Sequence, residues 1–404
     1  MLSRYKTYPL RNFIEQIRGV SYKKSDVSEV PKEGYIPLLR ANNIQAGKLV
    51  FSDVIYVKKE LVKSDQLIKK GDIIIAASSG SKEVVGKSGQ AHSDIDCTFG
   101  AFCKCIRAKE NINPRFLGYF FKTDYYSRSI SNRVNGANIN NLRNEHIDNL
   151  LIPIPSVSTQ EKIADVLDKT QELIDKRKAQ IEALDQLTQS VFLEMFGDPL
   201  RNNKNFEVVK LGEYTTHVSS GVTPRGGQSA YVPQGIPLIR SQNVHMNKLN
   251  LDDVVFITEE VHESMKRSQL RKYDVLLNIT GASIGRVAVY LGENNQANVN
   301  QHVCIIRLTE GVNPFYLSYY IASPQFQYSI KLLNSGATRE ALNYTQIKNF
   351  NILLPPLELQ NKFAEIVQKI ESQKDLLQKS LEELENNFHS LMQRAFKGEL
   401  FNEQ

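Results

Sequence analysis

Two stretches of the chain place apolar residues at alternating spacings of four and three, the pattern of a helix with one narrow apolar seam. The seam positions of the first stretch are Ile163, Leu167, Thr170, Ile174, Arg177, Ile181, Leu184, Thr188, Val191 and Met195. Those of the second stretch are Phe363, Val367, Ile370, Lys374, Leu377, Leu381, Leu384, Phe388, Leu391 and Ala395. A seam this narrow needs a partner helix. We therefore expect the two helices to pair antiparallel as a coiled coil with internal pseudo-two-fold symmetry; the alternative is two ordinary core helices.

Shorter apolar runs, broken by Gly, Asn and Ser, precede each long helix. Residues 72–76 and 274–277 each consist of an aspartate followed by small or aliphatic residues, which indicates buried strands. Helical patches are expected from Pro114 to Tyr126 and from Pro314 to Ile321. This mixture predicts compact α/β (α+β mixed) domains.

The chain therefore divides into two domains and two helices. Pro155 and Pro355 mark the end of the domain that precedes each helix, and Gly197 and Gly398 mark the ends of the helices. The predicted parts are a first head at 1–155, a central helix at 156–197, a second head at 198–355 and a C-terminal helix at 356–404.

The two halves of the chain repeat each other at an offset of 200 residues. The segment Ile36-Pro-Leu-Leu-Arg40 recurs as Ile236-Pro-Leu-Ile-Arg240. The same offset relates Asn113 to Asn313, Gly136 to Gly336, Pro155 to Pro355, Gln160 to Gln360 and Phe196 to Phe396. A local slip separates Asp72 from Asp274, but later positions return to phase. Chance does not keep one offset across so many anchors, so the chain is a duplication.

Composition adds modest constraints. With 404 residues the chain is expected to hold two or more domains. The net charge of +6 mildly favours a polyanionic partner but is weak evidence for nucleic acid. No stretch approaches the roughly 18 apolar residues of a membrane span, and no signal peptide is evident, so we expect a cytoplasmic protein without a membrane partner.

The cysteines indicate packing rather than chemistry. Cys103 and Cys105 alternate around Lys104, so both are expected to face one side of a strand. A zinc site with His92 and Cys97 lacks the usual CxxC spacing. Buried thiols are the better interpretation, and no metal site is predicted.

Two motifs resemble enzyme signatures and fail in detail. Residues 81–88 resemble a phosphate-binding loop, but Gly80 stands one residue too far from Gly86 for GxxxxGK[ST]. Asn313-Pro-Phe-Tyr316 resembles the catalytic tetrapeptide of amino-methyltransferases without its second proline, and helix capping by Asn and Pro explains it. No catalytic residue and no cofactor site are predicted in this chain.

Polar loops recur at equivalent positions with different side chains. Arg, Asn and Gln suit base edges, whereas Lys, Ser, Thr and glycine amides suit phosphate oxygens. The alternative is that Asn, Ser and Gly here are simply turn formers. The candidate DNA-binding residues of the first copy are Arg40, Asn42, Asn43, Ser79, Ser81, Lys82, Lys87, Asn138, Asn140 and Arg143. Those of the second copy are Arg240, Gln242, Asn243, Thr280, Ser283, Arg286, Thr338, Arg339 and Tyr344.

With these features the chain resembles the specificity subunits of type I restriction–modification systems. The resemblance rests on the duplicated head-and-helix plan, on residues 236–240 with Asn243, on the loop 280–286, on the helix lead-ins near Gln160 and Gln360, and on residues 191–199 at the end of the first helix. The lengthened loop of copy one, residues 79–87, departs from the family pattern.

The resemblance implies a non-catalytic subunit for host defence in the cytoplasm of a prokaryote. Each head would recognise one half of a bipartite site on double-stranded DNA, and the helices would set the spacing. Two methyltransferase subunits would dock on the chain, and restriction subunits would join them. S-adenosylmethionine, ATP and Mg are expected only in those partners. The alternatives are a stand-alone repressor-like DNA-binding protein, a specificity subunit of a related non-type-I system, and a scaffold that binds no DNA.

Overall fold

The computed structural model describes residues 3–81, 83–135, 141–334 and 341–401. The chain forms two compact units, one of residues 1–178 with 380–404 and the other of residues 179–379. Two long helices, α4 (Val157–Phe196) and α9 (Leu357–Lys397), pass from one unit into the other.

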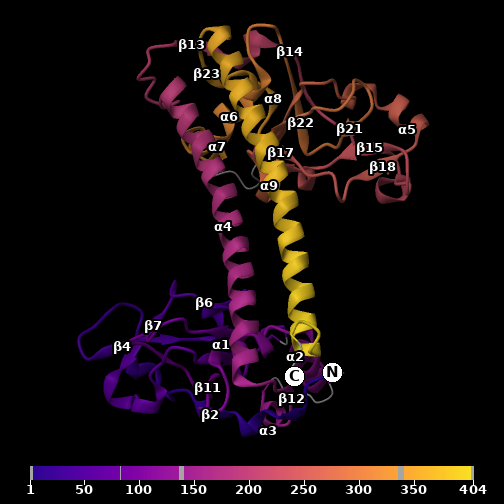
Figure 1. Ribbon diagram of the computed structural model, residues 1–404. Coiled ribbons are helices and arrows are strands. Elements are labelled where there is room, and N and C mark those ends of the chain that lie inside the picture. The colour runs from indigo at the N-terminus through magenta and orange to yellow at the C-terminus, as the bar shows by residue number, and fades with distance from the viewer. Residues whose placement is uncertain (1–2, 82, 136–140, 335–340, 402–404) are drawn as a thin grey trace. The chain divides into compact units, whose positions relative to one another are not determined.

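The first unit contains a head of short strands and helices (Figure 1). Its strands are β1 (Thr7–Pro9), β2 (Ile14–Arg18), β3 (Val27–Ser28), β4 (Tyr35–Leu39), β5 (Ile44–Gln45), β6 (Lys48–Leu49), β7 (Ile55–Lys58), β8 (Ile73–Ala76), β9 (Ser88–Gln90), β10 (Thr98–Phe99), β11 (Cys103–Ala108) and β12 (Leu151–Pro153). Its helices are α1 (Pro114–Phe120), α2 (Asp124–Asn135) and α3 (Asn144–Asp148). The sheets have the orders β1-β12, β10-β4-β7-β3 and β2-β11-β8-β9-β6-β5.

The second unit repeats most of this arrangement, with smaller sheets. Its strands are β13 (Glu207–Lys210), β14 (Thr215–Ser220), β15 (Ile236–Ile239), β16 (Val244–His245), β17 (Lys248–Leu249), β18 (Val255–Ile257), β19 (Val275–Asn278), β20 (Val287–Val289), β21 (Asn298–Val299), β22 (Val303–Leu308) and β23 (Asn351–Leu354). Its helices are α5 (Glu259–Ser264), α6 (Pro314–Ala322), α7 (Pro324–Asn334) and α8 (Tyr344–Lys348). The sheets have the orders β13-β23, β14-β22-β19-β20, β18-β15-β21 and β16-β17. The predicted mixed α/β fold in two copies is confirmed.

One predicted helix is wrong in its extent. The patch from Pro114 to Tyr126 is two helices, because α1 ends at Phe120 and α2 begins at Asp124. The Thr123 hydroxyl accepts a hydrogen bond from the Tyr126 amide and so caps the second helix. The periodicity alone concealed this break.

The long helices pair through their seams, as predicted. Every seam residue of α4 and α9 is buried or half-buried. In the first unit Lys178 forms an ion pair with Glu385 at 2.7 Å. In the second unit Lys374 forms one with Asp185 at 2.6 Å. From Lys178 to Asp185 the position advances along α4, whereas the partner moves back along α9 from Glu385 to Lys374, so the two helices are antiparallel.

Each head packs on the beginning of one long helix and on the end of the other. In the first unit Phe396, near the end of α9, packs against Phe116 of α1 with ring centroids 4.9 Å apart. In the second unit Phe196, at the end of α4, packs against Tyr316 of α6 at 4.7 Å. The two Phe residues that mark the repeat in the sequence therefore fill equivalent core positions.

A buried glutamine attaches each head to the helix that follows it. The side-chain oxygen of Gln160 accepts a hydrogen bond from the Asn113 amide at 2.8 Å, and Gln360 accepts one from the Asn313 amide at the same distance. Both glutamines also donate to the carbonyl of the proline five residues earlier. Because these side chains are 1% and 0% exposed, losing either bond would leave a buried polar group unsatisfied.

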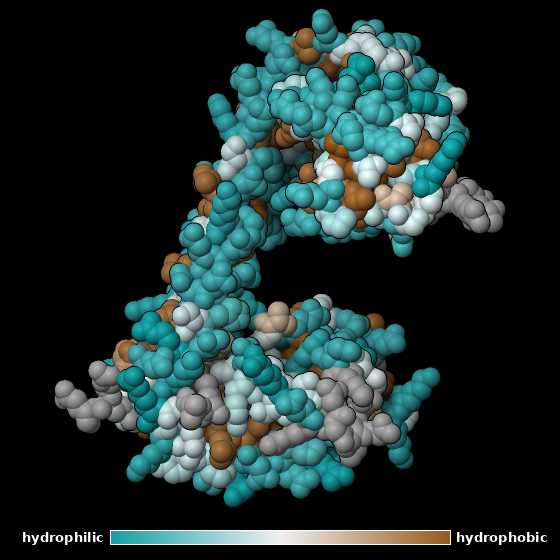
Figure 2. All heavy atoms as spheres, turned by 90° about the vertical axis from the view of Figure 1, so that its right-hand side faces the viewer, coloured by the Kyte–Doolittle hydropathy of each residue, from teal (hydrophilic) through white to brown (hydrophobic). Residues whose placement is uncertain are grey.

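The visible surface is mostly hydrophilic, and the cysteines are buried. In the part of the chain that the structure describes, no helix combines the length and apolarity needed to cross a membrane. Hydrophilic residues cover most of the face shown in Figure 2, and hydrophobic residues gather there in small patches. All four cysteines are buried and unpaired, and Cys103 and Cys105 both face the core from β11. The buried-thiol interpretation is confirmed.

Candidate nucleic-acid interface

Parallel strand pairing brings two of the predicted loops to one edge of each head. In the first head β4 and β10 run parallel, with Leu38 opposite Thr98, so the chain leaves both strands at the same edge. The segment after β4 begins with Arg40, and the segment after β10 ends with Phe102. In the second head β15 and β21 are paired in the same way, with Leu238 opposite Asn298.

Backbone hydrogen bonds tie two further segments to this edge. The Phe102 carbonyl accepts hydrogen bonds from the amides of Ala77 and Ser78, which follow β8. The Leu142 amide donates to the Ala77 carbonyl at 2.7 Å. In the second head the Leu342 amide donates in the same way to the Ile279 carbonyl at 2.9 Å.

We call this surface the loop edge. It consists of residues 40–43, 77–81, 100–102 and 141–143 in the first head, and of residues 240–243, 279–283, 300–302 and 341–343 in the second. The three recurrent polar loops of the sequence, together with a fourth segment that sequence reasoning missed, thus meet on one surface of each head.

An aspartate orients the polar side chains that follow β4. Asp53 accepts hydrogen bonds from Arg40 at 3.3 Å and from Asn42 at 2.9 Å. Asn42 is exposed and Arg40 is half-buried. Such prior ordering lowers the entropy that binding would cost.

The same arrangement follows β15 in the second head. Arg240 donates to the Asp253 carbonyl at 3.0 Å, and the Gln242 side chain donates to the Asp253 carboxylate. Among the described residues, the buried Nε atoms of Arg40 and Arg240 have no hydrogen-bond partner.

Two predicted contact residues have a structural role instead. Asn43 and Asn243 are 1% and 0% exposed. Each accepts a hydrogen bond from the arginine amide three residues earlier at 2.9 Å. The Asn43 amide group donates to the carbonyls of Val50 and Ser52. These side chains hold the loop in shape and have no free surface for DNA.

The basic residues Lys87 and Arg286 occupy equivalent turns. Each follows a glycine with positive φ, Gly86 at +88° and Gly285 at +87°. A Cβ on Gly86 would lie 2.6 Å from Cγ2 of Ile130, so glycine is required there for space as well as for conformation. The glycine and lysine that resemble a phosphate-binding loop are thus part of a structural turn that both copies share.

The remaining candidates lie at or beside the loop edge. Ser79 is half-buried and Ser81 is exposed, and the Arg143 side chain lies 3.5 Å from Glu145. The hydroxyls of Thr280 and Tyr344 are already hydrogen bonded, to His302 at 2.6 Å and to Ser220 at 2.6 Å. Ser283 is half-buried in the turn before Arg286. The candidates that lie outside the described residues are Lys82, Asn138, Asn140, Thr338 and Arg339.

Phe102 is the residue that sequence reasoning missed. It lines a pocket of about 470 Å³ on the first loop edge together with Tyr22, Arg40, Asn42 and Ser79. Its side chain is 68% exposed. The sequence offered one indirect signal: the position aligns with His302 at the 200-residue offset, so an apolar residue in one copy replaces a polar one in the other.

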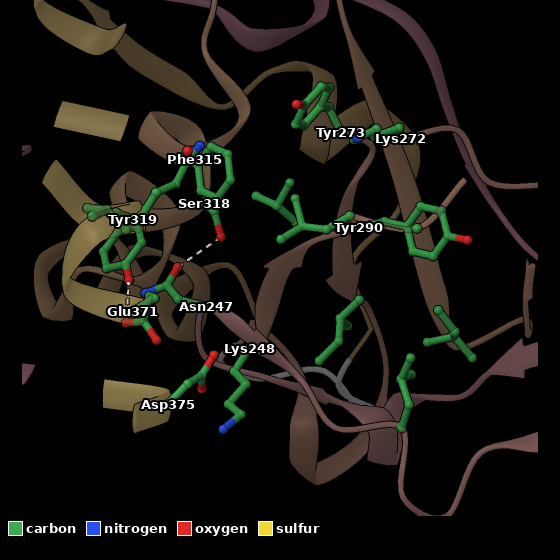
Figure 3. Close-up of a pocket in the computed structure, with 18 of the residues that line it drawn as sticks. Asn247, Lys248, Lys272, Tyr273, Tyr290, Phe315, Ser318, Tyr319, Glu371 and Asp375 are labelled. Atoms are coloured by element: carbon green, nitrogen blue, oxygen red, sulfur yellow. Dashed lines mark hydrogen bonds between the residues drawn. The ribbon is translucent and has the colours of Figure 1, made fainter. Parts of the chain in front are cut away.

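A larger groove lies in the second unit between the head and α9, with a volume of about 710 Å³ (Figure 3). Tyr319 donates to Glu371 at 3.3 Å, and Ser318 donates to Asn247 at 2.8 Å. Burial, and then the negative charge of Glu371, raise the pKa of Tyr319, so its hydroxyl stays protonated. Phe315 and Tyr273 extend toward the groove from its upper side in this view.

The corresponding part of the first unit differs from this groove. There Lys48 forms an ion pair with Asp175 at 2.9 Å, and Arg115, where the second unit has Phe315, forms one with Asp168 at 2.8 Å. The head and α4 are thus bridged by charged pairs. Because the two copies differ here, a function that both heads share fits the loop edges better than this groove.

One side-chain cluster has the composition of a metal site. Glu259, His262 and Glu263 on α5 bring their ligand atoms within 4.8 Å of one another. However, His262 is 2% exposed, and its two ring nitrogens already contact Asn298 and Gln269. Its imidazole is committed to the packing of the head, so the cluster does not fit a metal.

Each unit thus combines a mixed α/β head, an edge of polar loops and part of the long helix pair. The sequence matches the family described as the type I restriction modification DNA specificity domain over residues 3–184 and again over 203–386. The chain therefore belongs to this family, and the resemblance noted in the sequence is confirmed.

Individual relatives agree with this assignment. The chain is 31% identical to the type I restriction enzyme EcoKI specificity subunit of Escherichia coli (strain K12), across 97% of this chain and 88% of that protein. It is also 31% identical to the StySPI specificity subunit of Salmonella potsdam, across 98% and 89%. The fold is similar to the crystal structure of the type I restriction–modification S subunit from M. genitalium, with a TM-score of 0.58 at 15% identity over 98% of this chain and 96% of that one.

Proposed function

We propose that this chain is the subunit that reads DNA sequence in a type I restriction–modification complex, with each loop edge contacting one half of a bipartite target. One observation carries the proposal: the loop edge has the same backbone construction in both heads but different side chains. Asn42 is replaced by Gln242, and Phe102 by His302. Equal scaffolds with unequal side chains are what reading two different short sequences requires.

The chemistry of the complex is assigned to its partners. Two methyltransferase subunits dock on the chain and methylate adenine in each half-site, and restriction subunits join them. S-adenosylmethionine, ATP and Mg bind to those partners. The loop edges supply what recognition needs, namely amide and guanidinium donors, and the proposed parts of the chain at 1–155 and 198–355 are the two target recognition domains.

The charge of the chain supports binding within a complex. A net charge of +6 spread over 404 residues provides few phosphate contacts. We expect the isolated chain to bind DNA weakly and the complex to bind tightly and specifically, with an affinity that falls steeply as salt rises. Equal tightness for the isolated chain would favour the stand-alone DNA-binding alternative.

The test uses the two heads as controls for each other. N6-methyladenine is mapped in the host genome with the gene intact, deleted, or carrying Arg40→Ala or Arg240→Ala. Deletion should abolish methylation of one bipartite motif. Because a bidentate arginine contact is worth about 1–3 kcal/mol of discrimination, Arg40→Ala should relax one half of the motif and Arg240→Ala the other half.

A third variant separates recognition from general charge. Arg128 lies on α2 and its side chain is 81% exposed, with a 4.0 Å contact to Asp124. Arg128→Ala removes the same charge away from the loop edge and should leave both halves intact. The proposal is wrong if Arg40→Ala and Arg240→Ala alter the same half, or if neither alters the motif while deletion abolishes it.

Exchanging a whole head is a complementary test, and the structure refines its design. Residues 1–155 pack on Phe396 near the end of α9, through Phe116 and Phe120. A donor head must therefore keep aromatic or similar apolar residues at those two positions. With that contact preserved, the exchange should replace one half of the motif and leave the other unchanged.

A further inference from the structure

Phe102 exposes an aromatic ring at the centre of the first loop edge. Its side chain is 68% exposed, whereas Phe99, three residues earlier, and Cys103, the next residue, are fully buried. A solvent-exposed ring of this size forgoes the free energy that burying an apolar side chain would give. Burial of the ring against a ligand would recover that free energy.

The backbone around Phe102 is rigidly held, which distinguishes it from a mobile loop tip. Its carbonyl accepts hydrogen bonds from Ala77 at 2.8 Å and Ser78 at 3.0 Å. The Ala101 amide donates to the Val20 carbonyl at 2.9 Å, and the Cys103 amide donates to the Gly100 carbonyl at 2.8 Å. The ring is thus presented from a fixed base.

The neighbours of Phe102 are polar groups suited to base edges. Arg40, Asn42 and Ser79 line the same pocket. Their donors and acceptors match purine edges, but none of them can recognise an apolar group. In the major groove the apolar group that differs between base pairs is the C5 methyl group of thymine, which phenylalanine can contact.

We propose that Phe102 contacts the C5 methyl group of a thymine in the half-site that the first head reads. This inference rests on the proposed function and adds the identity of one base. It gives the first head an apolar contact that the second does not have at the equivalent position. There the equivalent His302 is only partly exposed, and its ring nitrogens contact Thr280 at 2.6 Å and Gln301 at 2.9 Å.

The test removes the C5 methyl group of thymine from the DNA. The complex of the chain with its methyltransferase subunits is titrated with duplexes in which each thymine of the first half-site, on either strand, is replaced in turn by deoxyuridine. Arg40→Ala identifies which half-site belongs to the first head. At one position deoxyuridine should weaken binding about four-fold, corresponding to the roughly 0.8 kcal/mol of one buried methyl-sized group.

Variants then connect that methyl group to Phe102. Phe102→Ala should weaken binding to the thymine duplex about ten-fold, and it should bind the deoxyuridine duplex no more weakly than the thymine duplex. Phe102→Leu, which keeps an apolar side chain, should retain part of the discrimination. Leu151→Ala is the matched control, because Leu151 is 46% exposed on β12, outside the sheets that carry the loop edge. It should bind both duplexes like the unmodified chain.

Several outcomes would overturn the inference. The inference is wrong if the first half-site contains no A·T pair, or if deoxyuridine weakens binding at none of its thymine positions. It is also wrong if the effect of deoxyuridine persists in Phe102→Ala. Unstacking of a base step, detected with 2-aminopurine and lost in Phe102→Ala without any deoxyuridine effect, would make Phe102 a wedge instead. If the complex does not prefer its motif over a scrambled duplex, the proposed function itself fails, and that outcome is distinct from these.

Discussion

Truncating Phe396 should destabilise the head at the opposite end of the sequence. Phe396 lies near the C-terminus, is 0% exposed, and packs on Phe116 and Phe120 of the N-terminal head at ring-centroid distances of 4.9 Å and 6.0 Å. Phe396→Ala leaves a cavity in that core. The second unit, residues 179–379, contains none of these three residues and should keep its stability.

The expected loss follows from the complete burial of the ring. Replacing a buried phenylalanine with alanine typically costs about 3–5 kcal/mol, which includes the cavity left behind. Aromatic pairs of this geometry contribute about 0.5–1.5 kcal/mol beyond the buried area. Because two rings contact Phe396, we expect a value toward the upper end of that range. A free energy of about 4 kcal/mol corresponds to nearly a thousand-fold change in an opening equilibrium.

Hydrogen exchange measured by mass spectrometry assigns this loss to one unit. Amides in the strands of the first head, for example β8 and β11, should exchange much faster in Phe396→Ala, because their protection reports the stability of that unit. Phe196→Ala is the matched variant. Phe196 is 1% exposed against Tyr316 and should affect the strands of the second head instead. If Phe396→Ala instead reduced the protection of amides in the second head, Phe396 would not belong to the core of the first head.

Three further predictions concern charges and thiols. Arg107→Ala should lower the free energy of unfolding, measured by urea denaturation, by about 3–5 kcal/mol. The reason is that the Asp72 carboxylate, which is 2% exposed, loses its ion-pair partner at 2.7 Å. A change below about 1 kcal/mol would contradict this prediction. Burial alone would lower the pKa of Lys374, but its hydrogen bonds to Asp185 and Glu371 raise it above 10.5. The stability that those bonds contribute is therefore complete below about pH 10.5 and is lost as the pH rises through the raised pKa. Lys374→Met should remove this contribution to the fall in melting temperature at alkaline pH. A pH dependence of the melting temperature that is unchanged in Lys374→Met would contradict the prediction. Burial raises the pKa of all four thiols, so iodoacetamide at pH 8 should label them only after denaturant is added, and rapid labelling of the folded chain would contradict the buried placement.

Much of the architecture could be predicted because it repeats within the chain. The heptad seams identified both long helices and their antiparallel pairing, since an apolar stripe must be buried whatever surrounds it. The break near Thr123 could not be predicted, because the apolar spacing continues across it while a side-chain hydrogen bond divides the helix. The predicted role of Asn43 was revised for a similar reason: an asparagine in a loop has the same sequence signature whether it caps the loop or faces outward.

The sequence by itself determined the duplication, the mixed heads, the helix pair and the membership of a DNA-specificity family. These features depend on residue spacing and residue type, which are local or periodic properties. Tertiary structure alone decided that four separate loops share one edge, because parallel pairing of β4 with β10 joins segments about 60 residues apart. It also decided that Phe396 belongs to the core of the first head, and that Phe102 stays exposed among polar neighbours. Contacts of this kind arise from the meeting of distant segments, and no periodicity along the chain encodes them.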